Sequence, residues 1–417
     1  MGAKLKVAYR FLALNKLTSL TVLSKQSHWQ AFTTHLVDNE YSQSSLEQCF
    51  ISINKASEFA PWHQLALGFT APIKASIEAK KLCDLQQQQT LVIPKRLCDA
   101  IYGKAIELIE EAHPLRSLIA HTENALQDNY VEGKRFLDEK VAQGKIYTFM
   151  NADGGIDNHK YASALQENQP YSVLDIIAPL AEKLPNVTLS NGTDFKRYRG
   201  QLITSSYIVC SGFSGMRDSE LDKLTPDSYF KDTFDGRDYH MLQSHTFKLG
   251  EKRETWVTAA SSKLAIELMS TLTKRWRSEV TYPDSKYTDS IWLNQAYRSK
   301  NPVLITGWSP RLQRFCQQFN MVVSEEDYQE CLKSNPRSLK RIEESVAVGQ
   351  PWPLTPHQFR RTLAFYCIKN RFGTLVALKQ QFKHLYLAMT EWYTMGGHLQ
   401  GCKRRQVNTA WLIAQLL

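Results

Sequence analysis

A histidine and an arginine stand three positions apart in the stretch TPHQFRRTLAFY, residues 355–366. Thr355 and Pro356 are typical of an N-cap and a first helical residue, so His357 and Arg360 are expected in the opening turns of a helix. Residues three apart share a helix face, and the free N–H groups at a helix start favour a phosphate oxygen. An ordinary helix start whose polar side chains face water would carry the same residues. Partners elsewhere in the chain must therefore decide between a phosphate-binding site and a solvated helix start.

Other segments supply side chains that could act with this pair. GFSGMRDSELDKL places Arg217 at a glycine-rich turn before a helix, with Glu220 three residues later. In FKLGEKRETWV, Lys248 stands at the turn between two β-prone runs, from which it could reach into a groove. QFKHLYLAMTEWYT adds His384 and, nine positions later, Tyr393. Each also has an ordinary interpretation. Arg217 and Glu220 could form a surface ion pair, Lys248 could be solvated, and Tyr393 could pack in the core.

In this order the residues resemble the tyrosine recombinase family, the phage-type integrases. GMRDSEL, HQFRRT, and FKH followed by TEWY are similar to the family's local motifs, and the resemblance covers about residues 170–400. His384 would then bind the phosphate or steady the helix of Tyr393, and Glu220 would position the first arginine region. The resemblance implies one catalytic set: Arg217, Lys248, His357, Arg360, His384 and Tyr393, with Glu220 in support.

The resemblance also implies a reaction, in which the tyrosine hydroxyl attacks a DNA phosphodiester and leaves a 3′-phosphotyrosyl enzyme and a free 5′ hydroxyl. Arg217 and Arg360 would hold the non-bridging oxygens, which carry charge in the transition state. His357 would take the proton of the tyrosine, and Lys248 would protonate the leaving oxygen. The bond energy stays in the covalent intermediate, so neither ATP, a metal nor any other cofactor is expected.

The sequence departs from the family pattern in several places. Arg361 stands where the family usually has histidine, and Lys383 replaces the glycine before the second histidine, so both would add positive charge near DNA. Lys252 competes with Lys248 for the role of general acid, and Lys248 is preferred for its place before the turn. Residues 324–352 could be an insertion that contacts DNA, contacts a partner subunit or does neither.

Periodicity predicts the elements that must position these residues. Helices are expected at 172–184, 194–210 and 262–277, and one or two long helices at 101–143 with a break near Pro114. The runs YHMLQSHTFK and ETWVTAA predict a β-hairpin. The pattern predicts a mainly α fold with a small antiparallel sheet (α+β): a helical core-binding-like domain with an extension at 1–165, and the catalytic domain at 166–417.

Composition narrows the function classes. The 417 residues carry a formal net charge of +10 and a pI near 9.0, which favours an anionic partner. Eight scattered cysteines include no CxxC pair, so they fit reduced thiols of a cytosolic protein better than a zinc site. No apolar run approaches the roughly 20 residues of a membrane span. We therefore expect a cytoplasmic, nucleoid-associated protein without a membrane partner.

Together these observations predict a site-specific DNA recombinase or integrase that integrates or excises a mobile element. It would act as a homo-tetramer on double-stranded DNA with specific attachment sites, and accessory DNA-bending proteins are compatible partners. The apolar end VNTAWLIAQLL (407–417) could dock onto a neighbouring protomer or pack in its own chain. The alternatives are a type IB topoisomerase-like or telomere-resolving enzyme, and a catalytically silent DNA-binding scaffold of the same fold.

Overall fold

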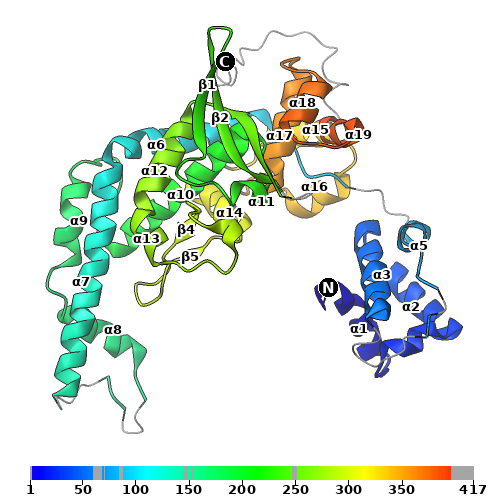
Figure 1. The fold of residues 1–417 in the computed structure, drawn as a ribbon, viewed down its shortest axis with the longest axis horizontal. Helices are drawn as coiled ribbons and strands as arrows, with labels where there is room; N and C mark the ends of the chain where they lie inside the picture. Colours follow the sequence, from blue (N-terminus) through cyan, green and yellow to red (C-terminus); the bar gives the residue numbers. More distant parts are fainter. Residues whose placement is uncertain are drawn as a thin grey trace. The chain divides into compact units, whose positions relative to one another are not determined.

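The chain forms two compact units, Met1–Gln89 and Thr90–Leu417 (Figure 1). The structure, a computed structural model, describes residues 2–59, 68–69, 71–83, 88–143, 149–151, 155–246 and 251–395. The first unit is helical, and its core contains Phe11, Phe32 and Phe50. Its elements are α1 (Gly2–Leu14), η1 (Leu20–Ser24), α2 (Gln26–Asp38), α3 (Gln43–Glu58) and α5 (Ala75–Leu82).

The second unit holds every predicted site residue that the structure describes. Its first helices are α6 (Lys95–Ala112), η2 (His113–Leu115), α7 (Arg116–Ala142), α8 (Asn158–Glu167), α9 (Val173–Ala181), α10 (Gly192–Ser214) and α11 (Asp218–Leu221). After the sheet follow α12 (Ser261–Leu272), α13 (Lys274–Glu279), η3 (Ser285–Tyr287), α14 (Ser309–Gln318), α15 (Glu325–Ser334), α16 (Leu339–Ser345), α17 (Pro356–Lys369), α18 (Leu375–Gln381) and α19 (Leu387–Thr394). The strands are β1 (Tyr229–Phe234), β2 (Arg237–Thr246), β3 (Lys252–Thr258), β4 (Leu293–Asn294) and β5 (Val303–Leu304).

These elements confirm the predicted fold class, a mainly α protein with a small antiparallel sheet. The expected helices are present as α9, α10 and α12 with α13. The break predicted near Pro114 is the short 3-10 turn η2 between α6 and α7. Proline lacks the N–H that a continuous helix would need at this point, so the chain changes helix here.

Helix α10 forms the centre of the second unit. Asn191 caps its start by accepting hydrogen bonds from the backbone N–H groups of Thr193 and Asp194. From Leu202 to Ser214 every residue is buried, as expected of a helix that is covered on all sides. It packs against α6, α12, α17 and β3, so its C-terminal end is fixed relative to both the sheet and α17.

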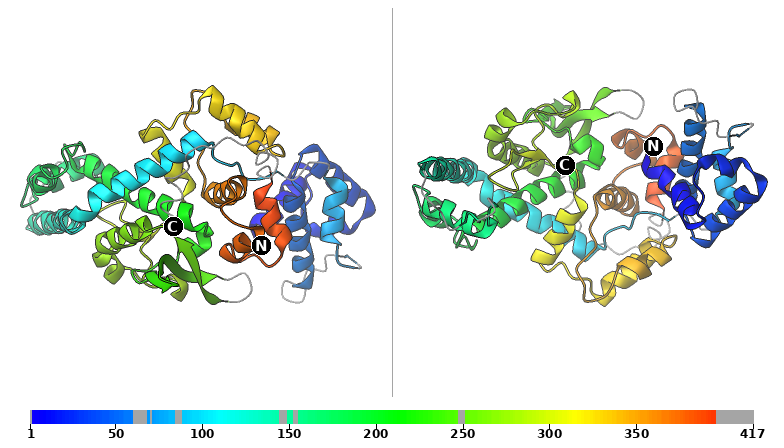
Figure 2. Two further views of the ribbon diagram at one scale, coloured as in Figure 1. Left: turned by 90° about the horizontal axis from the view of Figure 1, so that it is seen from above. Right: turned by 90° about the horizontal axis from the view of Figure 1, so that it is seen from below.

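A buried ion pair joins α10 to α7. Arg199 lies 2.5 Å from a carboxylate oxygen of Glu123, and the two side chains are only 3% and 2% exposed. Arg298 also reaches Glu123, at 3.2 Å. Because a buried charge is costly without a partner, the removal of one member would leave the other uncompensated. Beyond this pair, α7 and α9 extend side by side at one end of the second unit (Figures 1 and 2).

The sheet confirms the predicted hairpin and adds a strand. Its order is β1-β2-β3, with both pairs antiparallel. Leu242 on β2 pairs with Trp256 on β3, and both side chains are fully buried. Strand side chains alternate between faces, so this pair fixes which face of the hairpin meets α10. The hairpin register runs to the pair Thr246 and Lys252.

Residues 91–94, which directly precede α6, are buried. The backbone N–H of Val92 donates to the Asn335 side chain at 2.8 Å, and that of Ile93 donates to the Thr362 hydroxyl at 3.0 Å. Lys95 N–H donates to Glu330 at 3.0 Å. The segment 324–352 thus holds the start of α6, and α6 to α9 share the unit of α10. The compact units divide after Gln89, while the functional division at residue 165 stays a prediction.

The end of α10 requires a glycine. Gly215 has a φ of +64°, and its carbonyl accepts a hydrogen bond from Arg360. A Cβ added there would lie 2.5 Å from Phe382 Cε1 and 2.9 Å from Leu363 Cδ2. Both the left-handed backbone and the close approach of α17 and α18 exclude a side chain.

We predict that Gly215→Ala lowers the free energy of unfolding by roughly 1–3 kcal/mol more than Gly236→Ala, because only Gly215 would be overpacked. Gly236 is the matched control: its φ is +72°, and a Cβ there would meet nothing within 4 Å. Urea unfolding followed by tryptophan fluorescence measures both. Equal losses would contradict the tight packing at Gly215.

Candidate active site

The first arginine is held by a short helix and its own carboxylate. Arg217 is the N-cap of α11. Its backbone N–H donates to Glu220 Oε2 at 2.7 Å, and its guanidinium donates to Oε1 of the same residue at 2.6 Å. Glu220 is 2% exposed, whereas Arg217 remains 20% exposed. A buried carboxylate therefore orients an arginine that can still reach a ligand.

The second arginine ties three segments together. Arg360 on α17 is 2% exposed, and its guanidinium donates to the carbonyl oxygens of Gly215 at 2.6 Å and Phe382 at 2.5 Å. The same group lies 3.0 Å from His384 Nε2. One side chain thus joins the end of α10, the start of α17 and the turn after α18.

The second histidine and the tyrosine meet at this arginine. His384 Nδ1 lies 2.9 Å from the Thr390 hydroxyl on α19. Because Nε2 accepts from Arg360, Nδ1 is the nitrogen that can donate to Thr390, which assigns the neutral tautomer. The Tyr393 ring lies 5.3 Å from the His384 ring, and the Arg360 guanidinium lies 5.6 Å from the centre of the Tyr393 ring. Four predicted residues, Arg217 included, therefore converge from separate segments.

The electrostatics of this cluster favour an anion. The pKa of Arg360 is lowered to about 9, mainly by burial and then by the neighbouring charge of Arg217, while Glu220 and Tyr393 act in the opposite direction. Arg360 Nε is buried and has no hydrogen-bond partner among the described residues. Two guanidinium groups that disfavour each other's charge are stabilised when an oxyanion binds between them.

The first histidine faces another cavity. Helix α17 begins at Pro356 with Thr355 as N-cap, as predicted, and Gln358 Oε1 accepts from the Thr355 N–H at 3.1 Å. His357 is exposed, whereas Arg360, three residues later, is buried. It lines a cavity of about 380 Å³ with Asp218 and with Arg341 of α16, and none of Arg360, His384 and Tyr393 lines that cavity.

The predicted general acid cannot be placed. Lys248 lies outside the described residues. Its competitor Lys252 is the first residue of β3 and is exposed. The strands on either side of Lys248 pair in antiparallel order as far as Thr246 and Lys252, as the hairpin prediction requires. The choice between the two lysines stays a prediction.

The two departures from the family pattern have structural roles. Arg361 is 1% exposed and donates to the carbonyl oxygens of Trp392 at 3.0 Å and Met395 at 2.7 Å. Lys383 has a φ of +53°, and its ammonium lies 3.7 Å from Glu254 of β3. The burial of Arg361 speaks against the expectation that it adds positive charge near DNA, and for Lys383 that expectation stays a prediction. Arg361 is buried inside the protein, and the charge of Lys383 has a carboxylate beside it.

Other residues that hold the site were not foreseen. Gln381 donates through Nε2 to the carbonyl oxygens of Ser214 at 2.7 Å and Val257 at 2.8 Å, so it joins α18 to the end of α10 and to β3. A glutamine in a polar helix end gives no sequence signal of such a role. Asp218, whose pKa is raised by burial, accepts a hydrogen bond from the Tyr207 hydroxyl.

The loop after α11 is fixed by two tryptophans. Trp308 Nε1 donates to Asp222 Oδ1 at 3.1 Å, and Trp292 Nε1 donates to the Leu221 carbonyl at 2.6 Å. Both rings pack against Tyr207 of α10, with Trp308 stacked at 3.8 Å. These contacts hold the short helix that begins at Arg217.

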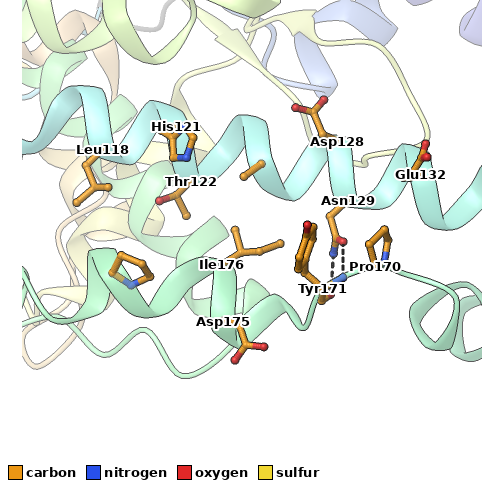
Figure 3. A pocket seen from close by; sticks show the side chains of 12 residues that line it. Leu118, His121, Thr122, Asp128, Asn129, Glu132, Pro170, Tyr171, Asp175 and Ile176 are labelled. Atoms are coloured by element: carbon orange, nitrogen blue, oxygen red, sulfur yellow. Dashed lines mark hydrogen bonds between the residues drawn. The ribbon is translucent and has the colours of Figure 1, made fainter.

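A larger cavity lies away from these residues. It has a volume of about 530 Å³ between α7 and α9 (Figure 3). Its wall is held by Asn129, whose side chain donates to the Tyr171 carbonyl at 2.9 Å and accepts from the Tyr171 N–H at 3.0 Å. None of the predicted site residues lines it.

Across the described ranges, no group of three or more His, Cys, Asp or Glu side chains could hold a metal ion. No helix within the described part of the chain is both long and apolar enough to cross a membrane.

The sequence matches no family model and no curated protein. Among solved structures the chain is similar to XerA recombinase, at 11% identity over 96% of this chain and 90% of that one, with a TM-score of 0.29. It is also similar to XerH site-specific recombinase bound to difH substrate, at 11% identity, 93% and 86% coverage and a TM-score of 0.29. A third is the Tn1549 transposon integrase with circular intermediate DNA, at 16% identity, 69% and 84% coverage and a TM-score of 0.26.

We predict that the stability of the folded protein depends on the protonation of Asp222. Burial raises the pKa of Asp222 from 3.8 to about 6, so the folded state binds this proton more tightly than the unfolded chain does. The carboxyl therefore becomes destabilising as pH rises from about 4 to 6, by at most about 3 kcal/mol.

Urea unfolding at pH 4.5 and pH 7 tests this. Asp222→Asn keeps an oxygen for Trp308 and removes the titration, so the variant should gain stability over the wild type as pH rises. Asp232→Asn, at an exposed position, is the control and should follow the wild type. A constant difference between Asp222→Asn and the wild type at both pH values would contradict the prediction.

Proposed function

We propose that the chain is a DNA strand-breaking and rejoining enzyme, a site-specific recombinase of the tyrosine type. One observation carries the proposal: Arg217, Arg360, His384 and Tyr393, which come from three distant segments, converge around one buried guanidinium. A core tyrosine or a surface ion pair would not require this arrangement. A phosphodiester that is attacked by a tyrosine would require it.

The phosphate would bind between the two arginines. Arg217 is partly exposed and already oriented by Glu220, so it can offer its remaining donors to a non-bridging oxygen. Arg360 keeps a free Nε and would gain the compensating charge that its buried site lacks. Both groups are fixed before the ligand arrives, which lowers the reorganisation needed in the transition state.

Tyr393 would then attack the phosphorus. The new bond joins the tyrosine oxygen to the 3′ phosphate, and the bond to the 5′ oxygen breaks. His357 lines a cavity apart from Tyr393, so it would have to approach the tyrosine hydroxyl to accept its proton. Lys248 would give a proton to the leaving 5′ oxygen. His384 would hold Arg360 and, through Thr390, the helix of the nucleophile. Attack by the 5′ hydroxyl of a second strand reverses the steps and reseals the DNA.

The partner in this proposal is double-stranded DNA that carries specific attachment sites. The net charge of +10 is consistent with contacts to the phosphate backbone, whose strength falls as salt rises. Strand exchange between two duplexes needs four active sites, so the working form would be a homo-tetramer on DNA. Integration or excision of a mobile element is the biological role that such exchange would serve.

We expect the wild-type protein to form a covalent adduct with DNA that survives SDS and is absent in Tyr393→Phe. The assay uses labelled duplexes cut from the DNA that flanks the gene, including nicked versions in which the cleaved strand diffuses away and cannot reseal. Tyr386→Phe is the matched control, since Tyr386 is 69% exposed at the start of the same helix. An adduct that persists in Tyr393→Phe would exclude Tyr393 as the nucleophile. DNA binding without an adduct on nicked duplexes would favour the silent scaffold.

We further predict that Lys248→Ala slows cleavage by about 10²–10⁴-fold, as loss of a general acid does. A substrate with sulfur in place of the 5′ bridging oxygen should restore the rate, because a thiolate leaves without a proton. Lys252→Ala is the control and should cleave both substrates at nearly the wild-type rate. If the sulfur substrate rescues Lys252→Ala instead, then Lys252 is the acid.

A further inference from the structure

The helix that carries the nucleophile is too short to be stable alone. Helix α19 has eight residues, Leu387–Thr394, and isolated helices of fewer than about 12 residues are marginal in water. The carbonyl groups of its last turn have no partner within the helix. Tyr393 is the penultimate residue of this helix, so its position depends on tertiary contacts.

Arg361 supplies two of these contacts at the C-terminal end. It donates to the Trp392 carbonyl at 3.0 Å and to the Met395 carbonyl at 2.7 Å, one on each side of Tyr393. A positive group at a helix C-terminus also interacts favourably with the helix dipole. The planar fork of arginine reaches both oxygens from one fixed position, which a lysine cannot do.

The neighbouring arginine holds the same tyrosine from its ring side. Arg360 lies 5.6 Å from the centre of the Tyr393 ring and contacts His384, which is hydrogen-bonded to Thr390 of α19. Two consecutive residues of α17 thus contact the nucleophile's helix at its ring and at its end. The backbone contacts of Arg361 fix where the helix ends, and so set the direction of the Tyr393 side chain.

We propose that Arg361 is a positioning residue for Tyr393, which holds the backbone of α19 in the orientation that presents the tyrosine hydroxyl for attack. This rests on the proposed function for Tyr393. Arg361 is 1% exposed, so direct contact with DNA is excluded in this arrangement. Its loss should lower the rate of attack and leave the affinity for DNA nearly unchanged.

The test compares Arg361→Met, Arg361→Lys and Arg337→Met in the full-length chain. Arg337 is the matched control, because it is exposed and contacts the same helix only through the face of Trp392, at 5.7 Å. Three quantities are measured: amide hydrogen exchange of residues 387–394 without DNA, affinity for a labelled duplex, and the single-turnover rate of adduct formation on a nicked duplex.

For Arg361→Met we expect amide exchange in 387–394 to be faster than in the wild type, with exchange in α10 unchanged. Adduct formation should be slower than in the wild type by roughly 10- to 100-fold. The affinity for DNA should stay within about threefold of the wild-type value. Arg361→Lys should lie between this variant and the wild type, and Arg337→Met should match the wild type. The intermediate behaviour of Arg361→Lys separates positioning from a general failure to fold.

Two outcomes overturn the proposal. Unchanged exchange and an unchanged adduct rate in Arg361→Met would show that Arg361 does not hold the helix. A fall in DNA affinity as large as the fall in rate would show that Arg361 acts on DNA binding. If the wild-type protein forms no adduct on any duplex, the proposed function fails. The exchange of 387–394 then still decides whether Arg361 holds α19.

Discussion

The buried guanidinium of Arg360 is the contact on which the arrangement of the site depends. It binds the carbonyl that ends α10, the carbonyl that ends α18, and His384. A charge that is 2% exposed loses its hydrogen bonds to water, so the bonds that Arg360 makes to these three segments favour keeping them together. The rest of the second unit, from the ion pair Arg199–Glu123 to the covering of α10, keeps those segments in place.

The same burial also sets the electrostatics of the cluster. The pKa of Arg360 is lowered to about 9, first by burial and then by Arg217. The cluster therefore holds more positive charge than its own carboxylate, Glu220, balances. A bound phosphate would supply the missing negative charge, so the site without a ligand is already arranged for one. Preorganised charge of this kind is a large contribution to many enzymatic rates.

Three residues in the first turns of α17 meet different surroundings. His357 is exposed on the first turn, Arg360 is buried toward α10, and Arg361 is buried toward α19. Different positions of a helix point in different directions, so one helix can contact the end of α10 through one residue and α19 through another. Helix α17 thereby connects the first arginine region to the tyrosine although 176 residues separate Arg217 from Tyr393.

Local sequence determined the parts of this protein that depend on local physics. Thr355 and Pro356 gave the start of α17, Pro114 the break between α6 and α7, and β-prone runs the hairpin, because caps, prolines and alternation act over a few residues. Only tertiary structure decided the roles of Arg361 and Gln381, since their partners lie 31 to 167 positions away and leave no local pattern. Tertiary packing also decided the burial of two charged side chains. The sequence shows that Arg360 and Arg361 are adjacent, but only the packing shows that both are buried from solvent.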